Sequence, residues 1–136
     1  MADAQALFDW RNDAATRAAS HQTGELVYTE HCAWLEKTLS NPLRHLYIAL
    51  VNGDAVGTFR VDVGEMGDAE LSWTVAPQAR GNGYGKLMVK TAADRYPGRL
   101  KAEIKAGNAA SIRIAEAAGF ALESERDGCL YYARHQ

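Results

Sequence analysis

Several features are scarce or missing in this sequence of 136 residues, and each absence excludes a class of protein. The two cysteines, Cys32 and Cys129, lie far apart and form no C-x-x-C pair, so neither a disulfide framework nor a zinc site is expected. No basic block stands out and the formal net charge is -2, which argues against a nucleic-acid partner. No stretch could span a bilayer, and MADAQALFDW lacks the basic start of a signal peptide. We therefore expect a cytoplasmic protein without a metal, a nucleic-acid partner or a membrane anchor.

The length and the composition indicate one globular domain. With 47% hydrophobic and 24% charged residues, the chain resembles ordinary globular proteins and can form one sizeable core. No internal repeat, low-complexity segment or linker divides it. Residues 1–136 are accordingly predicted to form a single domain.

The spacing of apolar residues predicts the order of the elements. Helices are expected over residues 3–19, from an N-cap at Thr29 to just before Pro42, over 83–96 and over 108–119, and strands over 46–51, 55–63, 69–75 and 100–106, with two more around Asp127-Gly128. Asn52-Gly53 predicts a hairpin between the first two strands. The helix between strands 69–75 and 100–106 predicts a β-α-β crossover with parallel pairing. The fold class is a mixed α/β or α+β domain.

The segment from Arg80 to Lys86 is rich in glycine and lies between a predicted strand and a predicted helix. Its glycines allow backbone N–H groups to point inward, and the helix N-terminus adds partial positive charge, so the segment is predicted to bind an anion. A P-loop would need glycine at position 80 and Ser or Thr at 87, and a dinucleotide fingerprint would need glycine at 86. These mismatches disfavour a nucleotide-binding enzyme. The helix is expected to turn an inner stripe of five residues to the core: Tyr84, Leu87, Met88, Thr91 and Ala92.

A different family pattern fits this segment. The run Arg80 to Gly85 matches Q/R-x-x-G-x-G/A, the pyrophosphate loop of the GCN5-related N-acetyltransferases, and residues 46–136 resemble that superfamily. Val75-Ala76-Pro77 resembles its V-x-P, and Asn108-x-x-Ser111 with Gly119-Phe120 resembles its N-x-x-A/S…GF. The resemblance implies a twisted, mostly antiparallel sheet flanked by about four helices. The usual first strand is missing, which leaves two options: a sheet one strand short, or a homodimer in which a partner supplies that strand.

The resemblance also implies the reaction and the co-substrate. An acetyl group would pass directly from acetyl-CoA to a primary amine in a ternary complex, with no metal. The implied coenzyme A residues are Trp73, Thr74, Val75, Arg80, Gly81, Asn82, Gly83, Tyr84, Gly85, Lys86, Asn108 and Ser111. The Val75 N–H would face the thioester carbonyl as an oxyanion donor. Asn108 has a second interpretation, as a helix cap.

Two glutamates are candidates for the base that deprotonates the amine. Glu103 lies on the polar face of strand 100–106 between two lysines, and it resembles the glutamate of the acetyltransferases that modify the N-termini of ribosomal proteins. Glu70 lies on strand 69–75, where other members of the family place a base. Either residue could instead be a strand carboxylate that faces solvent or pairs with lysine.

The family's usual acid, which protonates the departing thiolate, is absent from this sequence. Many relatives carry a tyrosine seven residues after the asparagine, where this chain has Ala115, whose small side chain is expected to leave a gap beside the sulfur. Tyr131, Tyr132 or a water would then supply the proton. The two tyrosines point to opposite faces of the last strand, so at most one of them faces the cleft.

The acceptor is expected to lie over the first two helices and the last hairpin. DWRND at 9–13 and EHCAWLEK at 30–37 resemble the start of the branch that acetylates nucleotide-linked amino sugars, and also the branch that acetylates protein α-amines. Candidate acceptor residues are Arg11, His31 and Trp34, although His31 and Trp34 could instead anchor the helix to the sheet. The expected acceptor is therefore an amino sugar nucleotide or another small amine. The alternatives are a peptide α-amine and, because of Ala115, a non-catalytic acyl-CoA-binding module.

Overall fold

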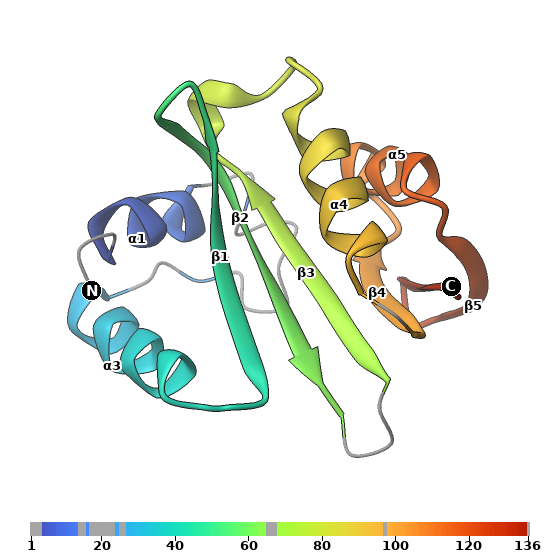
Figure 1. Cartoon of the computed structure of the whole chain (residues 1–136), viewed down its shortest axis with the longest axis horizontal. Helices are drawn as coiled ribbons and strands as arrows, with labels where there is room; N and C mark the ends of the chain where they lie inside the picture. The colour runs from blue at the N-terminus through green and yellow to red at the C-terminus, as the bar shows by residue number, and fades with distance from the viewer. Residues whose placement is uncertain are drawn as a thin grey trace.

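The computed structural model describes residues 4–13, 16, 24, 27–64, 68–96 and 98–135, and it shows a six-stranded mixed sheet with a pair of helices at each side (Figure 1). The elements are α1 (Ala4–Asn12), α3 (Tyr28–Leu39), β1 (Arg44–Val51), β2 (Asp54–Val63), β3 (Ala69–Val75), a 3-10 turn (Pro77–Ala79), α4 (Tyr84–Asp94), β4 (Leu100–Lys105), α5 (Ala109–Ala117), β5 (Ala121–Arg126) and β6 (Cys129–Arg134). Within these residues, no helix has the length and apolar character needed to cross a membrane. The predicted fold class is confirmed.

Two tight turns join the hairpins of the sheet. Asn52 and Gly53 have φ of 52° and 86°, and Asp127 and Gly128 have φ of 52° and 79°. Two successive residues with positive φ form the turn that matches the right-handed twist of paired strands, and Asn-Gly and Asp-Gly favour it. Both predicted hairpins, β1–β2 and β5–β6, are confirmed.

The strand order is β1-β2-β3-β4-β6-β5, and β3–β4 is the one parallel pair in the described sheet. Helix α4 makes the predicted crossover between them. The parallel pairing contains two residue pairs, Ala69 with Leu100 and Glu70 with Lys101, although β3 continues to Val75. Beyond Glu70 the two strands therefore diverge, and a gap opens inside the sheet toward the glycine-rich segment.

The two faces of the sheet carry separate hydrophobic cores. On one face, Leu71, Leu100 and Tyr132 pack against Met88 and Val89 of α4. On the other face, Leu46 and Ile48 of β1 pack with α1 and α3, whose buried residues include Leu7 and Leu35. Side chains alternate between the faces along each strand. On that face α3 contacts β1 and α1 contacts β3, and the polar side chains of Glu70, Lys101 and Glu103 remain exposed.

The first two helices differ from the prediction. Helix α1 ends at Asn12, and the part of the predicted helix 3–19 beyond it is only partly described. The N-cap of α3 is Val27 rather than Thr29, which lies inside the first turn, so the predicted cap is wrong. Val27 has no side-chain oxygen to accept a hydrogen bond. Within the described residues before Arg44, the regular elements are the helices α1 and α3.

The predicted inner stripe of α4 is partly wrong. Met88 and Ala92 are buried as expected, but Leu87 is 63% exposed and Thr91 is also exposed. Gly85 decides the orientation: it packs so tightly against its surroundings that its side of the helix faces the protein. Leu87, two residues later, is rotated by about 200° and points to solvent. Val89 and Ala93 are buried in its place.

Helix α5 ends as the sequence predicts. Gly119 has φ of 92°, the Phe120 N–H donates to the Ala115 carbonyl at 3.0 Å, and the Gly119 N–H donates to the Glu116 carbonyl at 3.1 Å. This pair of bonds is a Schellman motif, and it satisfies two carbonyls at the helix end. Phe120 is buried in the core next to the start of β5.

Candidate active site

A cavity of about 780 Å³ opens where β3 and β4 diverge. Its lining combines the glycine-rich segment, the first turns of α4 and α5, the polar faces of β2, β3 and β4, and side chains from α1 and α3. Among the residues predicted from the sequence, the lining includes Arg11, Trp34, Glu70, Trp73, Thr74, Val75, Arg80, Gly81, Gly83, Tyr84, Gly85, Lys86, Glu103, Asn108 and Ser111. Four predicted site residues do not line it: His31, Asn82, Tyr131 and Tyr132.

The glycine-rich segment presents backbone to open space. Gly81 and Gly83 have φ of 84° and 77°, and a Cβ built on either would meet no atom within 4 Å. Gly83 is the N-cap of α4 and offers no side-chain oxygen, and no acidic residue lies in the first helical turn. The N–H groups of that turn have no carbonyl of their own helix to bond, and the helix dipole adds positive charge there. The segment therefore has the shape and polarity of a pyrophosphate site.

Polar side chains hold this segment in shape. Asn82 Nδ2 donates to the Ala79 carbonyl at 3.1 Å, so its side chain folds back on the segment instead of lining the cavity. Arg80 Nη2 donates to Asp13 Oδ2 and to Thr16 Oγ1, both at 2.9 Å. The hydrogen bond and charge of Arg80 lower the pKa of Asp13. Arg80 thus lies at the cavity with an ion-pair partner already beside it.

Gly85 is constrained by packing. It lines the cavity, but a Cβ at Gly85 would lie 2.6 Å from Ile114 Cδ1 and 2.9 Å from Val75 Cγ2. The constraint at Gly85 is therefore the close packing of α4 on α5 and β3. At Gly81 and Gly83, by contrast, the missing side chains leave open space beside the backbone.

The backbone of β3 faces the gap at alternate residues. The Ala76 N–H donates to the Val56 carbonyl of β2 at 2.8 Å. Because successive residues of a strand present their polar groups to opposite sides, the N–H groups of Val75 and Trp73 point away from β2, toward the gap. The two strands do not pair there, so these groups are available to an extended ligand.

Asn108 is a helix cap, as one of its two interpretations predicts. Its Oδ1 accepts a hydrogen bond from the Ser111 N–H at 3.2 Å, and α5 begins at the next residue. Asn108 and Ser111 also line the cavity. Capping does not remove Asn108 Nδ2 from use, because the bond occupies only the side-chain oxygen.

Two carboxylates share the open face of the sheet. Glu70 pairs across the sheet with Lys101, and Glu103 lies two residues further along β4, so both side chains point to the same side. Removal of water by the surrounding protein, and then the negative charge of Glu103, raise the pKa of Glu70; Asp62 adds to the increase, while Lys101 and Arg60 oppose it. Glu70 stands at the point where the gap begins.

Neither of the two candidate tyrosines lines the cavity, and Ala115 does not line it either. Tyr132 is 4% exposed and packs in the core beneath α4 and α5. Tyr131 lies opposite Glu103 on the accessible face, where partial burial and the Glu103 carboxylate raise the pKa of its hydroxyl. Ala115 is fully buried in the core, its carbonyl accepts the Phe120 N–H, and it does not line the cavity, so the gap expected beside the sulfur stays a prediction.

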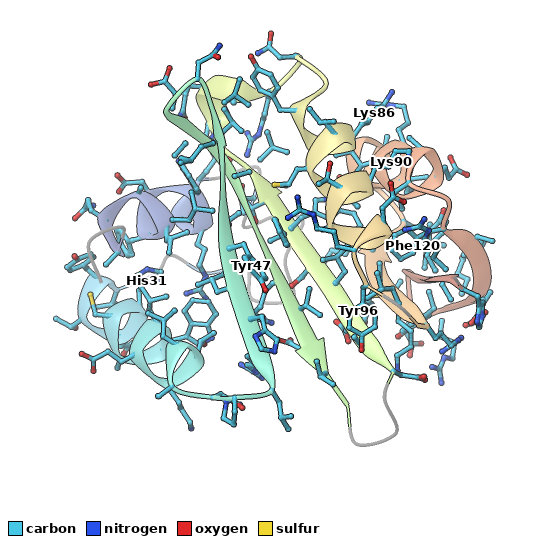
Figure 2. All side chains as sticks on the ribbon, viewed as in Figure 1. His31, Tyr47, Lys86, Lys90, Tyr96 and Phe120 are labelled. Carbon is cyan, nitrogen blue, oxygen red and sulfur yellow. The ribbon has the colours of Figure 1, made fainter. Side chains whose placement is uncertain are left out.

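Arginine and aromatic side chains form the other end of the cavity. The Arg11 guanidinium carbon lies 4.0 Å from the centre of the Trp34 ring, and that of Arg60 lies 5.6 Å from it. Arg11 Nη1 donates to His31 Nδ1 at 2.8 Å. Burial, and then the charge of Arg11, lower the pKa of His31, which keeps the ring neutral and Nδ1 able to accept. His31 is buried between α1 and α3 and anchors Arg11 (Figure 2).

Arg60 and Arg113 were missed by the sequence reading. Arg60 lies on β2 opposite Ser72, and the alternation of residues 55–63 could have placed it on the polar face. Arg113 lies on α5, two residues after Ser111, where helical spacing alone does not show that it reaches the cavity.

On α4, Lys86 and Lys90 extend outward on the helix side of the molecule (Figure 2).

Comparisons with known proteins agree with this geometry. A family model described as an acetyltransferase (GNAT) domain matches residues 1–121. No significant match was found among proteins of curated function. The crystal structure of ribosomal-protein-alanine N-acetyltransferase from Brucella melitensis is 27% identical, with 99% of this chain and 95% of that chain covered and a TM-score of 0.77.

Two further structures share the fold at lower identity. YncA, a putative acetyltransferase from Salmonella typhimurium with its cofactor acetyl-CoA, is 21% identical, with 98% and 88% of the chains covered and a TM-score of 0.79. Spermidine N-acetyltransferase from Vibrio cholerae, in complex with CoA and spermine, is 13% identical, with 97% and 88% covered and a TM-score of 0.82. At these identities the likeness concerns the fold.

Proposed function

The chain belongs to the acetyltransferase (GNAT) family, and on that premise we propose that it transfers the acetyl group of acetyl-CoA to a primary amine by direct attack in a ternary complex. Family membership makes it an acetyl-CoA-dependent N-acetyltransferase. The single observation that carries the mechanism is the divergence of β3 and β4 after Glu70, with the glycine-rich segment at one end of the gap and two carboxylates at the other.

Acetyl-CoA would lie along this gap. The pyrophosphate would meet the backbone N–H groups around Gly81 and Gly83 and the positive end of α4. The pantetheine arm would extend between β3 and β4, where the unpaired polar groups of Trp73 and Val75 face it. Two proteins of the same fold are described as complexes with acetyl-CoA and with CoA, which supports acetyl-CoA as the co-substrate.

The Val75 N–H would stabilise the oxyanion formed when the amine attacks the thioester. A fixed donor in a partly dehydrated cavity stabilises charge that develops in the transition state, and removing such a donor in other enzymes costs about 100-fold or more in kcat. The backbone position also makes the donor independent of side-chain identity. The remaining contribution comes from holding the amine and the thioester together.

We assign the base to Glu70. Desolvation, and then the charge of Glu103, raise the pKa of Glu70 above that of an ordinary carboxylate, which makes it a stronger base, although its side chain is still exposed to solvent. It also lies at the start of the gap, whereas Glu103 lies beside Tyr131, further from β3. The role of Glu103 is then to hold the pKa of Glu70 high.

Water would protonate the departing thiolate. Tyr132 faces the core and Tyr131 does not line the cavity, so their placement favours neither as the acid. A thiol has a pKa of about 8.5, so the thiolate leaves readily without a general acid from the protein. Replacing either tyrosine by Phe should lower kcat by less than the roughly 100-fold typical of general acid catalysis.

A peptide α-amine remains the second candidate acceptor. It is favoured by the 27% identity over 99% of this chain with the ribosomal-protein-alanine enzyme. An amino sugar nucleotide is the other acceptor class suggested by the sequence. A non-catalytic acyl-CoA-binding module would use the same cavity but release no thiol.

The test measures free thiol and acetylated product with acetyl-CoA and a panel of amines. Transfer is expected, with kcat lowered about 10²- to 10³-fold in Glu70→Gln and less in Glu103→Gln. Calorimetry of acetyl-CoA binding to both variants is the control. Binding without amine-dependent thiol release would establish the non-catalytic module, and a larger loss in Glu103→Gln would move the base to Glu103.

A further inference from the structure

The acceptor end of the cavity carries arginine side chains whose charge is only partly neutralised. We infer, on the basis of the proposed function, that the acceptor is a small primary amine that also carries an anionic group, a carboxylate or a phosphate, which Arg60 and Arg11 bind beside Trp34. Such a substrate is chemically opposite to a polyamine.

Arg60 presents a free guanidinium fork. Its Nε lies 2.9 Å from Asp62 Oδ1, and its side chain is 23% exposed. Among the described residues, no partner is found for its two terminal nitrogens, although the residue lines the cavity. Neither terminal nitrogen is among the buried, unpartnered polar atoms of the described residues, so both are accessible to a ligand, and their planar pair of donors fits a carboxylate or a phosphate.

Arg11 has no counter-ion at all in the described part of the chain. Its hydrogen-bond partner is the neutral ring of His31, and its guanidinium stacks on Trp34. Burial, and then the charge of Arg60, lower the pKa of Arg11, which shows that the two guanidinium groups repel each other. An anion between them would remove that repulsion.

The carboxylate that bonds Arg60 is shared with a second arginine. Asp62 lies 2.9 Å from Arg60 and 3.8 Å from Arg44, so a single negative charge serves two guanidinium groups. Over the whole cavity lining, positive side chains outnumber negative ones: Arg11, Arg60, Arg80, Lys86, Lys105 and Arg113 against Glu70 and Glu103. A substrate with several ammonium groups would therefore meet an excess of like charge over the cavity as a whole.

The strand register brings the base and the arginine close together. Arg60 lies opposite Ser72, and Glu70 lies opposite Asp62. The Arg60 Nε donates to Asp62, so the Arg60 side chain extends along the sheet toward Glu70. The charge of Arg60 also opposes the increase in the pKa of Glu70. The amine near Glu70 and the anion near Arg60 therefore fit within one small molecule.

The experiment compares matched pairs of amines with saturating acetyl-CoA. The carboxylate pair is 4-aminobutanoate and 4-aminobutanamide, the phosphate pair is 3-aminopropyl phosphate and 3-aminopropanol, and spermidine is the polycation. We expect kcat/KM to be at least about tenfold higher for the anionic member of a pair, because bonds to charged groups are stronger than neutral ones. The pair with the larger ratio of kcat/KM identifies the anionic group as a carboxylate or a phosphate.

Arginine variants test whether the named side chains cause the preference. Arg60→Gln and Arg11→Gln should each bring the ratio of kcat/KM, anionic over neutral member, toward one. Arg60→Lys keeps the charge but loses the fork, so its ratio should lie between those of the Gln variants and that of the parent. Arg95→Gln is the matched control, because it removes one positive charge from the exposed end of α4, outside the cavity. Its ratio should equal that of the parent.

The outcomes separate this inference from the proposed function. A preference for the neutral member or for spermidine, or a ratio unchanged in Arg60→Gln, overturns the inference while amine acetylation stands. If acetyl-CoA binds but no amine releases thiol, the proposed function fails. Thermal shifts of the acetyl-CoA-loaded protein with the same pairs then decide the inference: a larger shift with the anionic members supports it, and equal shifts overturn it.

Discussion

The two ends of the cavity recognise charge in different ways. At the glycine-rich end, backbone N–H groups of one continuous segment and the start of α4 present a positive surface, and the missing side chains of Gly81 and Gly83 are what matters. At the arginine end, Arg11, Trp34 and Arg60 come from α1, α3 and β2. A backbone site can be encoded locally, whereas a site of side chains from three elements exists only once the sheet and helices have packed.

The largest expected effect tests the backbone end. Gly83→Val should weaken acetyl-CoA binding by about 100-fold or more, since the side chain would fill the open space and disturb charge-assisted hydrogen bonds. The valine would also have to adopt φ near 77°. Calorimetry on a variant shown to be folded by circular dichroism measures the effect, and an unchanged affinity would contradict the assignment of this segment.

The neighbouring glycine provides the matched contrast. Gly85→Ala should destabilise the fold by about 1–3 kcal/mol, because the new methyl would overlap Ile114 and Val75 in the packed interior. Denaturant unfolding measures this change. Acetyl-CoA affinity should fall less than in Gly83→Val, and a stable Gly85→Ala protein with lost affinity would place Gly85 in the ligand site instead.

Arg80 should matter less than the glycines. Arg80→Ala is expected to weaken acetyl-CoA binding only a few-fold, because its side chain is 39% exposed and salt screens such contacts. Asp13→Asn should act in the opposite direction, because it removes the carboxylate that competes with the pyrophosphate for Arg80. Titrations at low and high salt measure both, and weaker binding in Asp13→Asn would show that the ion pair positions Arg80.

The smallest expected effect is a pH shift at the centre of the cavity. Glu103 raises the pKa of Glu70 and Lys101 lowers it, so Glu103→Gln should move the acidic limb of the kcat profile to lower pH and Lys101→Gln to higher pH. The active form of Glu70 is ionised, so activity rises as pH passes its pKa. Each shift should be below about one unit for partly exposed charges. Shifts of the same sign in both variants would exclude Glu70 as the titrating base.

Local sequence was sufficient for most of the fold. Asn52-Gly53 and Asp127-Gly128 produced their hairpins because only residues tolerant of positive φ can form those turns. Alternation in residues 100–105 predicted which side chains of β4 are buried, and the asparagine and glycine flanking α5 predicted both of its ends. The errors occurred where tertiary contacts decide: the start of α3 at Val27 and the orientation of α4, which is set by the packing of Gly85.

The sequence by itself determined the anion-binding segment, because glycine spacing before a helix is a property of a few consecutive residues. Only the tertiary structure decided which carboxylate and which arginines meet in the cavity. The gap beside Glu70 results from how far β3 and β4 pair, and no local pattern encodes that length. Arg60 approaches Arg11 and Trp34 because β2 is covered by α1 and α3, and these residues are more than twenty positions apart in the chain. Long-range packing therefore assembles the proposed acceptor site, while local sequence encodes the proposed coenzyme site.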